Sequence, residues 1–223
     1  MGVLNAVRCS YGALRALSGL TKFINLFCRR FDRTENAAVR ARAALPPGRL
    51  NGQALAPLAA LPYGAWTMEH NGCEVIAVYN ALLALHRAVP LPEIAGQLEK
   101  RGLLFNGFGG TNLSAVAAYL RSLGIGVNVL RRRERERFDA AFAAADCAIL
   151  SYWTGRTLRD ADGDWNTLHT VSVQRGFAGV ELCNCASNWP APHSARSIAD
   201  FLAREHGEPV CLFALKTVDK PGG

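Results

Sequence analysis

The spacing of apolar residues divides the chain into a helical part followed by a strand-rich part. Over residues 73–87 the apolar positions follow helical spacing and surround nearly the whole helix, which is typical of a buried helix. Two further helices are predicted, one over residues 92–101 with proline in its first turn, and one that Thr111 or Asn112 caps and that runs to Leu123. The middle of the chain is therefore expected to be mainly helical.

The last third of the chain changes to the two-residue period of strands. The predicted strands are residues 127–130, 147–153, 168–174, 179–185 and 210–218, with short helices from the charged run 131–137 through Phe142 and over 197–204. Helices that come first and strands that come second indicate an α+β fold, in which helices pack on an antiparallel sheet.

The N-terminal region has a different character. Leu17, Leu20, Ile24, Phe27 and Phe31 recur at amphipathic spacing with basic residues between them. We divide the chain into a basic helical arm (1–45), a linker or surface strap rich in proline and glycine (46–62), and the main domain (63–223). The arm is interpreted as a helix that packs on the main domain; the alternatives are a membrane-surface anchor and an inhibitory or partner-binding segment.

The net charge of +7 comes from the first 50 residues, most of which belong to the arm. Residues 1–50 contain nine basic and two acidic side chains, which leaves 16 of each sign in the rest of the 223-residue chain. A neutral main domain lacks the electrostatic footprint of a nucleic-acid-binding protein, so we do not expect nucleic acid as a partner.

Seven cysteines at irregular spacing favour a reducing compartment. Basic residues interrupt any secretory signal near the start, and the longest uncharged apolar stretch is too short for a membrane-spanning helix. We therefore expect a cytoplasmic protein whose oligomeric state the sequence leaves open.

Three residues form a candidate catalytic set. Cys73 begins the buried helix, where the helix dipole and free amides favour a thiolate. His169 heads an alternating strand and shares a face with Val171, on the side where a helix should pack. Asn184 on the next strand is expected to orient the imidazole, with Asn188 as its rival.

The chain carries a resemblance to papain-like cysteine peptidases on these residues. The order of Cys, His and Asn matches that family, and the segments NGCEVIAVYNAL (71–82), NGFGGTN (106–112) and LHTVSV (168–173) resemble its compact bacterial branch, related to the double-glycine peptidases that process bacteriocin leaders. The resemblance covers about residues 63–217. It implies a papain-like fold and a peptide or protein substrate.

The resemblance also assigns roles. It makes Cys73 the nucleophile, His169 the general base and then acid, and Asn184 the orienting residue. Relatives place a glutamine six residues before the cysteine to stabilise the oxyanion, and this chain has Thr67 there. Asn71 is the candidate replacement donor, with His70 as a lesser option.

Gly109 and Gly110 are expected to line the substrate groove, although a plain turn before a helix cap explains the same glycines. A zinc site built from Cys183 and Cys185 with Cys73 and His169 is disfavoured, because paired zinc ligands usually come from a turn with two to four intervening residues. We expect neither metal nor cofactor. The alternatives to a peptidase are a degenerate domain that binds a peptide or partner protein, and an acyltransferase or amidase with the same residues.

Overall fold

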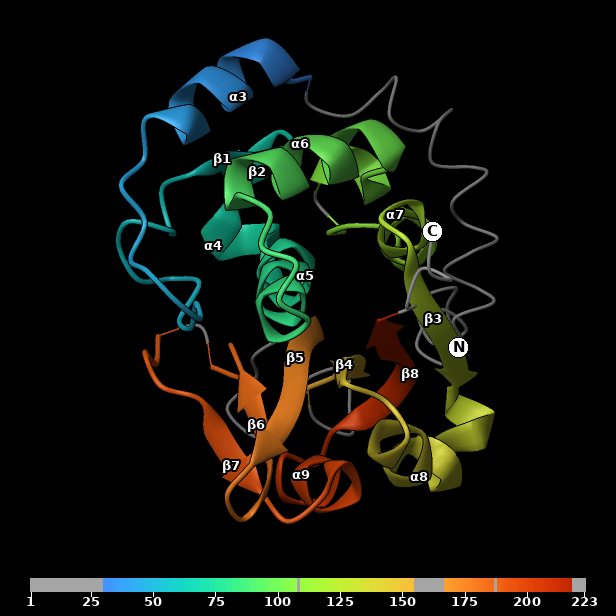
Figure 1. Ribbon diagram of the computed structural model, residues 1–223. Helices are drawn as coiled ribbons and strands as arrows, with labels where there is room; N and C mark the ends of the chain where they lie inside the picture. Colours follow the sequence, from blue (N-terminus) through green and yellow to red (C-terminus); the bar gives the residue numbers. More distant parts are fainter. Residues whose placement is uncertain (1–29, 108, 155–166, 187, 218–223) are drawn as a thin grey trace, which may run out of the picture.

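The computed structural model describes residues 30–107, 109–154, 167–186 and 188–217 (Figure 1). Its helices are α3 (Arg33–Ala41), α4 (Met68–Asn71), α5 (Cys73–Ala84), α6 (Leu91–Arg101), η1 (Leu104–Gly107), α7 (Leu113–Ser122), η2 (Arg132–Arg137), α8 (Phe138–Ala143) and α9 (Ile198–Arg204). Its strands are β1 (Pro62–Tyr63), β2 (Trp66–Thr67), β3 (Ile125–Arg131), β4 (Cys147–Trp153), β5 (Leu168–Gly176), β6 (Gly179–Cys183), β7 (His193–Ala195) and β8 (Glu208–Thr217). The predicted α+β class and the main predicted helices and strands are confirmed.

The strands β3 to β8 form one six-stranded sheet in the order β3-β8-β4-β5-β6-β7, and every neighbouring pair is antiparallel. The hairpin of β1 and β2 forms a separate two-stranded sheet. In the register between β4 and β5, Tyr152 lies opposite His169 and Ser151 opposite Thr170. Because paired residues share a face, this register decides which helices each side chain meets.

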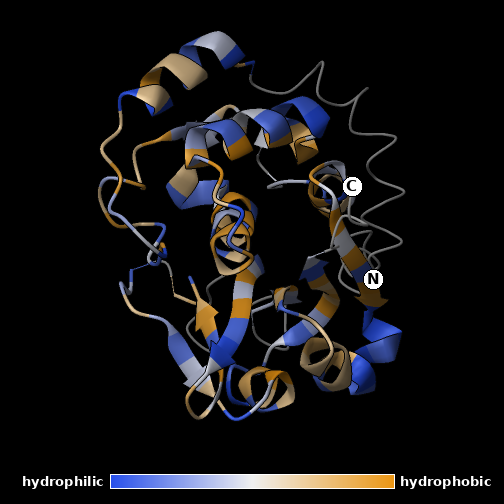
Figure 2. Ribbon diagram, in the orientation of Figure 1, coloured by the Kyte–Doolittle hydropathy of each residue, from blue (hydrophilic) through white to orange (hydrophobic). Residues whose placement is uncertain are grey.

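Each face of the sheet is covered by different helices. One core cluster joins α5, α6 and α7 to one face through residues such as Ile149 and Phe213, and the other joins α8 and α9 to the opposite face through Leu150, Val171 and Leu212. Figure 2 shows that apolar residues dominate α5, which lies between the sheet and the outer helices. Helix α5 is therefore the buried central helix that its sequence predicts.

Gly72 allows α5 to begin directly where α4 ends. A Cβ atom at this position would lie 2.6 Å from the sulfur of Met68 and 2.7 Å from its carbonyl oxygen. Glycine is required here because α4 ends and α5 begins at the same residue, and the two helices leave no room for a side chain.

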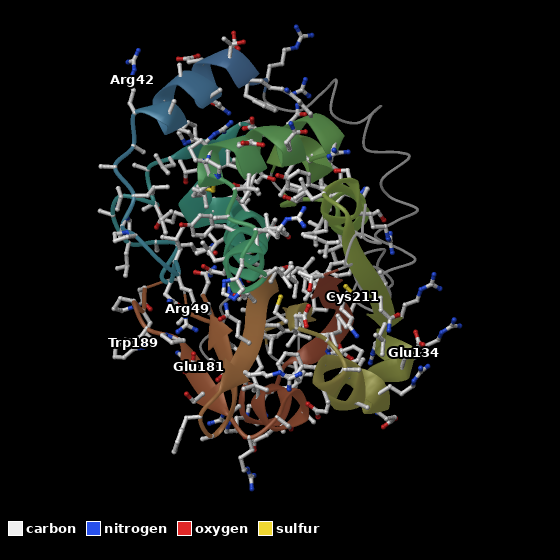
Figure 3. All side chains as sticks on the ribbon, in the orientation of Figure 1. Arg42, Arg49, Glu134, Glu181, Trp189 and Cys211 are labelled. Carbon is white, nitrogen blue, oxygen red and sulfur yellow. The ribbon has the colours of Figure 1, made fainter. Side chains whose placement is uncertain are left out.

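Residues between α3 and β1 wrap along the domain. Leu50, Leu58 and Leu61 are buried in the core, and the side chain of Asn80 in α5 exchanges two hydrogen bonds with the backbone of Leu50. Arg49 forms an ion pair with Glu181 on β6 (Figure 3). This strap, residues 42–61, thereby fastens the helical layer to the sheet.

The predicted amphipathic positions Leu17, Leu20, Ile24 and Phe27 lie outside the described residues. The described part of the arm forms α3, whose Arg40 is fully buried against Glu99 of α6. None of the helices in the described ranges is long and apolar enough to cross a membrane.

Candidate active site

Cys73 lies at the first position of α5 and is only 6% exposed. Its thiol donates a hydrogen bond to Oε2 of Glu74, with a sulfur–oxygen distance of 3.3 Å. The backbone amide of Thr170, one residue after His169, lies close enough to the sulfur to lower the pKa of the thiol. The thiol thus lies against the strand that carries the predicted base, while its own hydrogen goes to a carboxylate.

The expectation that the helix start favours the thiolate is wrong for this resting structure. Burial raises the pKa of Cys73 well above its ordinary value, and the charge of Glu74 and its hydrogen bond raise this pKa further. The amide of Thr170 opposes these effects without cancelling them. Desolvation and a neighbouring anion therefore outweigh the favourable helix terminus.

His169 lies on the sheet face covered by α9. Its ring meets Tyr152 edge to face at a centroid distance of 6.0 Å, and Tyr152 packs in the same way on Phe201 of α9. The alternation of β5 correctly predicts a face on which a helix packs, but this helix is α9, whereas Thr170 faces the side of α5. Cys73 and His169 therefore reach the start of β5 from different sides, and no hydrogen bond between the described residues joins the thiol to the imidazole.

The imidazole of His169 is fixed by a backbone carbonyl. Nε2 lies 2.5 Å from the carbonyl oxygen of Asn184, and because a carbonyl can only accept, Nε2 carries the proton. Nδ1 is then the unprotonated nitrogen, able to accept a proton. Burial lowers the pKa of His169 below its ordinary value, which favours this neutral ring.

Of the two predicted orienting residues, the structure places Asn184 against His169, whereas Asn188 is exposed. The side chain of Asn184 is turned away from the ring. Its Oδ1 accepts from the backbone amide of Gln53, its Nδ2 donates to Oε1 of Gln53, and its own amide donates to Asn51. Asn184 therefore orients His169 through its carbonyl, and the strap holds Asn184.

Replacing Gln53 by Ala is expected to lower the free energy of unfolding by about 1–3 kcal/mol, because the amide group of the buried Asn184 side chain loses its partner. Chemical denaturation measures this change. Gln97→Ala, at a half-buried position of α6, is the matched control and should change the free energy by less than about 0.5 kcal/mol. An equal effect of both substitutions would contradict the assigned role of Gln53.

Asn71 does not fit the predicted role of oxyanion donor. Its Nδ2 donates to the carbonyl oxygens of Tyr63 and Gly107, at 3.3 and 2.6 Å, so both of its N–H groups are used. Asn71 instead joins the β1–β2 hairpin to the loop before α7. The first-turn amides of α5, which have no partners within the helix, are the remaining candidates for oxyanion donors.

Gly109 and Gly110, predicted to line the substrate groove, serve other contacts. A Cβ at Gly109 would lie 3.0 Å from the side chain of Leu104, and one at Gly110 would lie 3.1 Å from Oε1 of Glu74. Gly110 also has a φ of +74°, which disfavours any other residue. This loop makes room for the Glu74 carboxyl.

An open cavity of about 670 Å³ lies beside His169. It is lined by Gln53, Ala54, Trp66, Thr67, Glu69, His70, Thr154, Thr167, His169 and Cys185. Thr67 and His70 thus lie where substrate would approach, and the ring of His70 stacks on Trp66 at 4.6 Å. The cavity connects the start of β5 with the segment just before Cys73.

The two remaining candidate metal ligands, Cys183 and Cys185, differ in their exposure to solvent. Cys183 is buried on β6, and Cys185 is partly exposed at the cavity. Over the described ranges, no group of three or more His, Cys, Asp or Glu side chains is arranged to hold a metal ion.

Sequence reasoning missed Glu74, Gln53 and Tyr152. A glutamate inside an otherwise apolar helix was a usable signal for Glu74, because carboxylates are rarely fully buried. Gln53 and Tyr152 gave no such signal, since their contacts with the site depend on the fold.

Comparisons with known proteins do not assign the chain to a family. No family model matches the chain, and a search of curated proteins finds no significant similarity.

Proposed function

We propose that the protein is a papain-like cysteine peptidase in which Cys73 is the nucleophile and His169 the proton acceptor and donor. The observation that carries the proposal concerns the start of β5, which holds His169. The first residue of α5, Cys73, and the residue that follows β6, Asn184, both lie against this part of the strand. The backbone amide of Thr170 lies close enough to the Cys73 sulfur to lower the pKa of the thiol, and the adjacent His169 has Nε2 held by the carbonyl of Asn184, so Nδ1 is the nitrogen that can accept a proton. The open cavity gives a substrate access to the imidazole.

The proposed reaction needs only these groups. Sγ of Cys73 and Nδ1 of His169 share no hydrogen bond within the part of the chain that the structure describes, so the reaction requires them to come into contact first. The thiol proton then passes to Nδ1 of His169, and the sulfur attacks the carbonyl carbon of a peptide bond. The first-turn amides of α5 stabilise the developing oxyanion. The carbon–nitrogen bond breaks, His169 protonates the leaving amine, and water then hydrolyses the thioester to release the acid and restore the thiol.

A reducing compartment such as the cytoplasm suits this proposal, because a nucleophilic thiol must stay reduced. The five described cysteines are free thiols. Contact of the basic arm with a membrane surface is a separate proposal that concerns residues mostly outside those described; flotation with liposomes, with and without residues 1–45, tests it.

The test combines hydrolysis with thiol labelling. A degenerate peptide mixture should gain new N-termini with the wild-type protein and none with Cys73→Ala or His169→Ala. At pH 6, iodoacetamide should alkylate Cys73 faster than Cys185, the partly exposed thiol at the same cavity, and His169→Ala should remove this preference. Absence of hydrolysis together with slow labelling of Cys73 would refute the peptidase.

A second candidate, a domain of the same fold that binds a peptide without cleaving it, is favoured by one observation. The Cys73 thiol gives its hydrogen to Glu74 and has a raised pKa. Tight binding of peptides from the mixture, unchanged by Cys73→Ala and without product, would support this candidate.

A further inference from the structure

Glu74 is a buried carboxyl group that the proposed reaction does not use. It is 1% exposed in the first turn of α5, and within the part of the chain that the structure describes no cation forms an ion pair with it. Burying an unpaired carboxylate is unfavourable, and such groups are rare unless the site requires them. Its position next to the nucleophile therefore calls for a chemical explanation.

The contacts of Glu74 are arranged around the thiol. Oε2 accepts the thiol hydrogen of Cys73 at 3.3 Å, and the backbone amides of Glu74 itself and of Thr111 lie close enough to the carboxyl to lower its pKa. Gly110 lies so close that a Cβ there would be 3.1 and 3.3 Å from the two carboxylate oxygens. The loop before α7 thus confines the carboxyl against the sulfur.

A carboxylate in this position stabilises the thiol and opposes the thiolate. The hydrogen bond needs a hydrogen on sulfur, and ionisation of Cys73 would place two negative charges side by side in a site with little water. Protonation of Glu74 removes the second charge and supplies an O–H donor for the thiolate.

We propose that Glu74 keeps the Cys73 thiol protonated at rest and must itself take up a proton before Cys73 forms a thiolate–imidazolium pair with His169; this inference rests on the function proposed above. The thiol proton moves to Nδ1 of His169, and one further proton moves from solvent to Glu74. The reactive state therefore holds one proton more than the resting state. Glu74 acts through Cys73 as a positioning residue.

The electrostatics of the site agree with this assignment. Burial raises the pKa of Glu74 from 4.5 to about 7, so the carboxyl changes charge near neutral pH. Among the described residues, the titratable groups that interact with Glu74 are Cys73 on the same helix and Tyr63 on β1. The pKa of Tyr63 is raised well above its ordinary value, mainly by burial, so its charge does not change in this range.

The decisive experiment is the rate of Cys73 alkylation by iodoacetamide between pH 5.5 and 8.5, followed by peptide mapping. Glu74→Gln resembles the protonated carboxyl. It should react at a rate similar to wild type at pH 5.5 and about tenfold or more faster at pH 8, since each unit of lowered thiol pKa raises the thiolate fraction about tenfold. Glu93→Gln, an exposed first-turn residue of α6, should follow wild type throughout. A Glu74→Gln rate equal to or below wild type at pH 8 overturns the inference.

A second measurement does not depend on the folding of that variant. In Cys73→Ala the carboxylate loses its thiol donor, so the carboxyl of Glu74, followed by carbon NMR, should titrate at higher pH than in wild type. An unchanged titration would also overturn the inference. Failure of wild type to cleave peptides would refute only the peptidase, because both readouts report the Glu74–Cys73 coupling without turnover.

Discussion

Glu99→Gln is expected to lower the free energy of unfolding by about 3–5 kcal/mol, because it leaves the guanidinium of Arg40 buried without a counter-charge. In the structure NH1 and NH2 of Arg40 donate to the two carboxylate oxygens of Glu99 at 2.7 and 2.9 Å. Neither side chain has appreciable exposure, so water cannot replace the lost charge. Such a loss is a large fraction of the stability of an ordinary domain, and chemical denaturation should detect it directly.

The design of this experiment uses two comparisons. Arg42→Met removes an exposed basic side chain just after the same helix (Figure 3) and should change the free energy by less than about 0.5 kcal/mol. The double substitution Arg40→Met with Glu99→Leu should recover most of the loss, because a buried ion pair is often replaceable by apolar side chains. A Glu99→Gln protein as stable as wild type would show that this pair does not hold α3 in place.

The same network connects the arm with the candidate active site. Glu99 also accepts from Asn36 of α3 and from the backbone amide of Gly64, and Arg40 donates to the carbonyl of Pro62. Gly64 lies in the hairpin whose second strand supplies Trp66 and Thr67 to the cavity. Helix α3 is therefore bound to the segment that forms one wall of the proposed substrate site.

The sequence predicts those features that depend on local periodicity. The apolar spacing after Cys73 predicts α5 because a helix surrounded by core must be apolar on all sides, and the run 147–153 matches β4. The alternation after Leu168 also predicts that His169 lies on a face where a helix packs. Local spacing does not give the order of strands, so it could not show that this helix is α9.

The hydrogen-bond partners of the polar side chains in the site could not be predicted from the sequence, for a different physical reason. Gln53 and Asn184 are 131 positions apart, and Arg40 and Glu99 are 59 apart. Hydrogen bonds between such distant segments leave no periodic trace in either segment. Asn71 illustrates the difficulty: its amide is suitable for an oxyanion, yet the fold places two carbonyls against it. Residue type gives the available chemistry, and only the fold gives the partner.

Glu74→Gln is expected to change how the free energy of unfolding depends on pH, by about 3 kcal/mol between pH 4.5 and 7. The pKa of Glu74 is 4.5 when the group is solvated and about 7 in the folded protein because of burial. Between these values the folded state keeps a proton that the unfolded state has released. Rising pH therefore favours unfolding of the wild-type protein across this window, and the effect levels off once the pH is well beyond the folded pKa of Glu74.

The variant has no carboxyl at this position, so its stability relative to wild type should increase as pH rises through the window. His169 acts in the opposite direction, because its lowered pKa makes the unfolded state bind more protons below its ordinary value of 6.5. This contribution is present in both proteins and cancels when their free energies are subtracted. Urea unfolding at pH 4.5, 5.5, 6.5 and 7.5 gives the difference, with Glu93→Gln as the exposed control. A difference that stays constant over these pH values would mean that Glu74 is ionised throughout the window, and the carboxylate would then have to be stabilised by its hydrogen bond to Cys73 and the nearby amide of Thr111 rather than neutralised by burial.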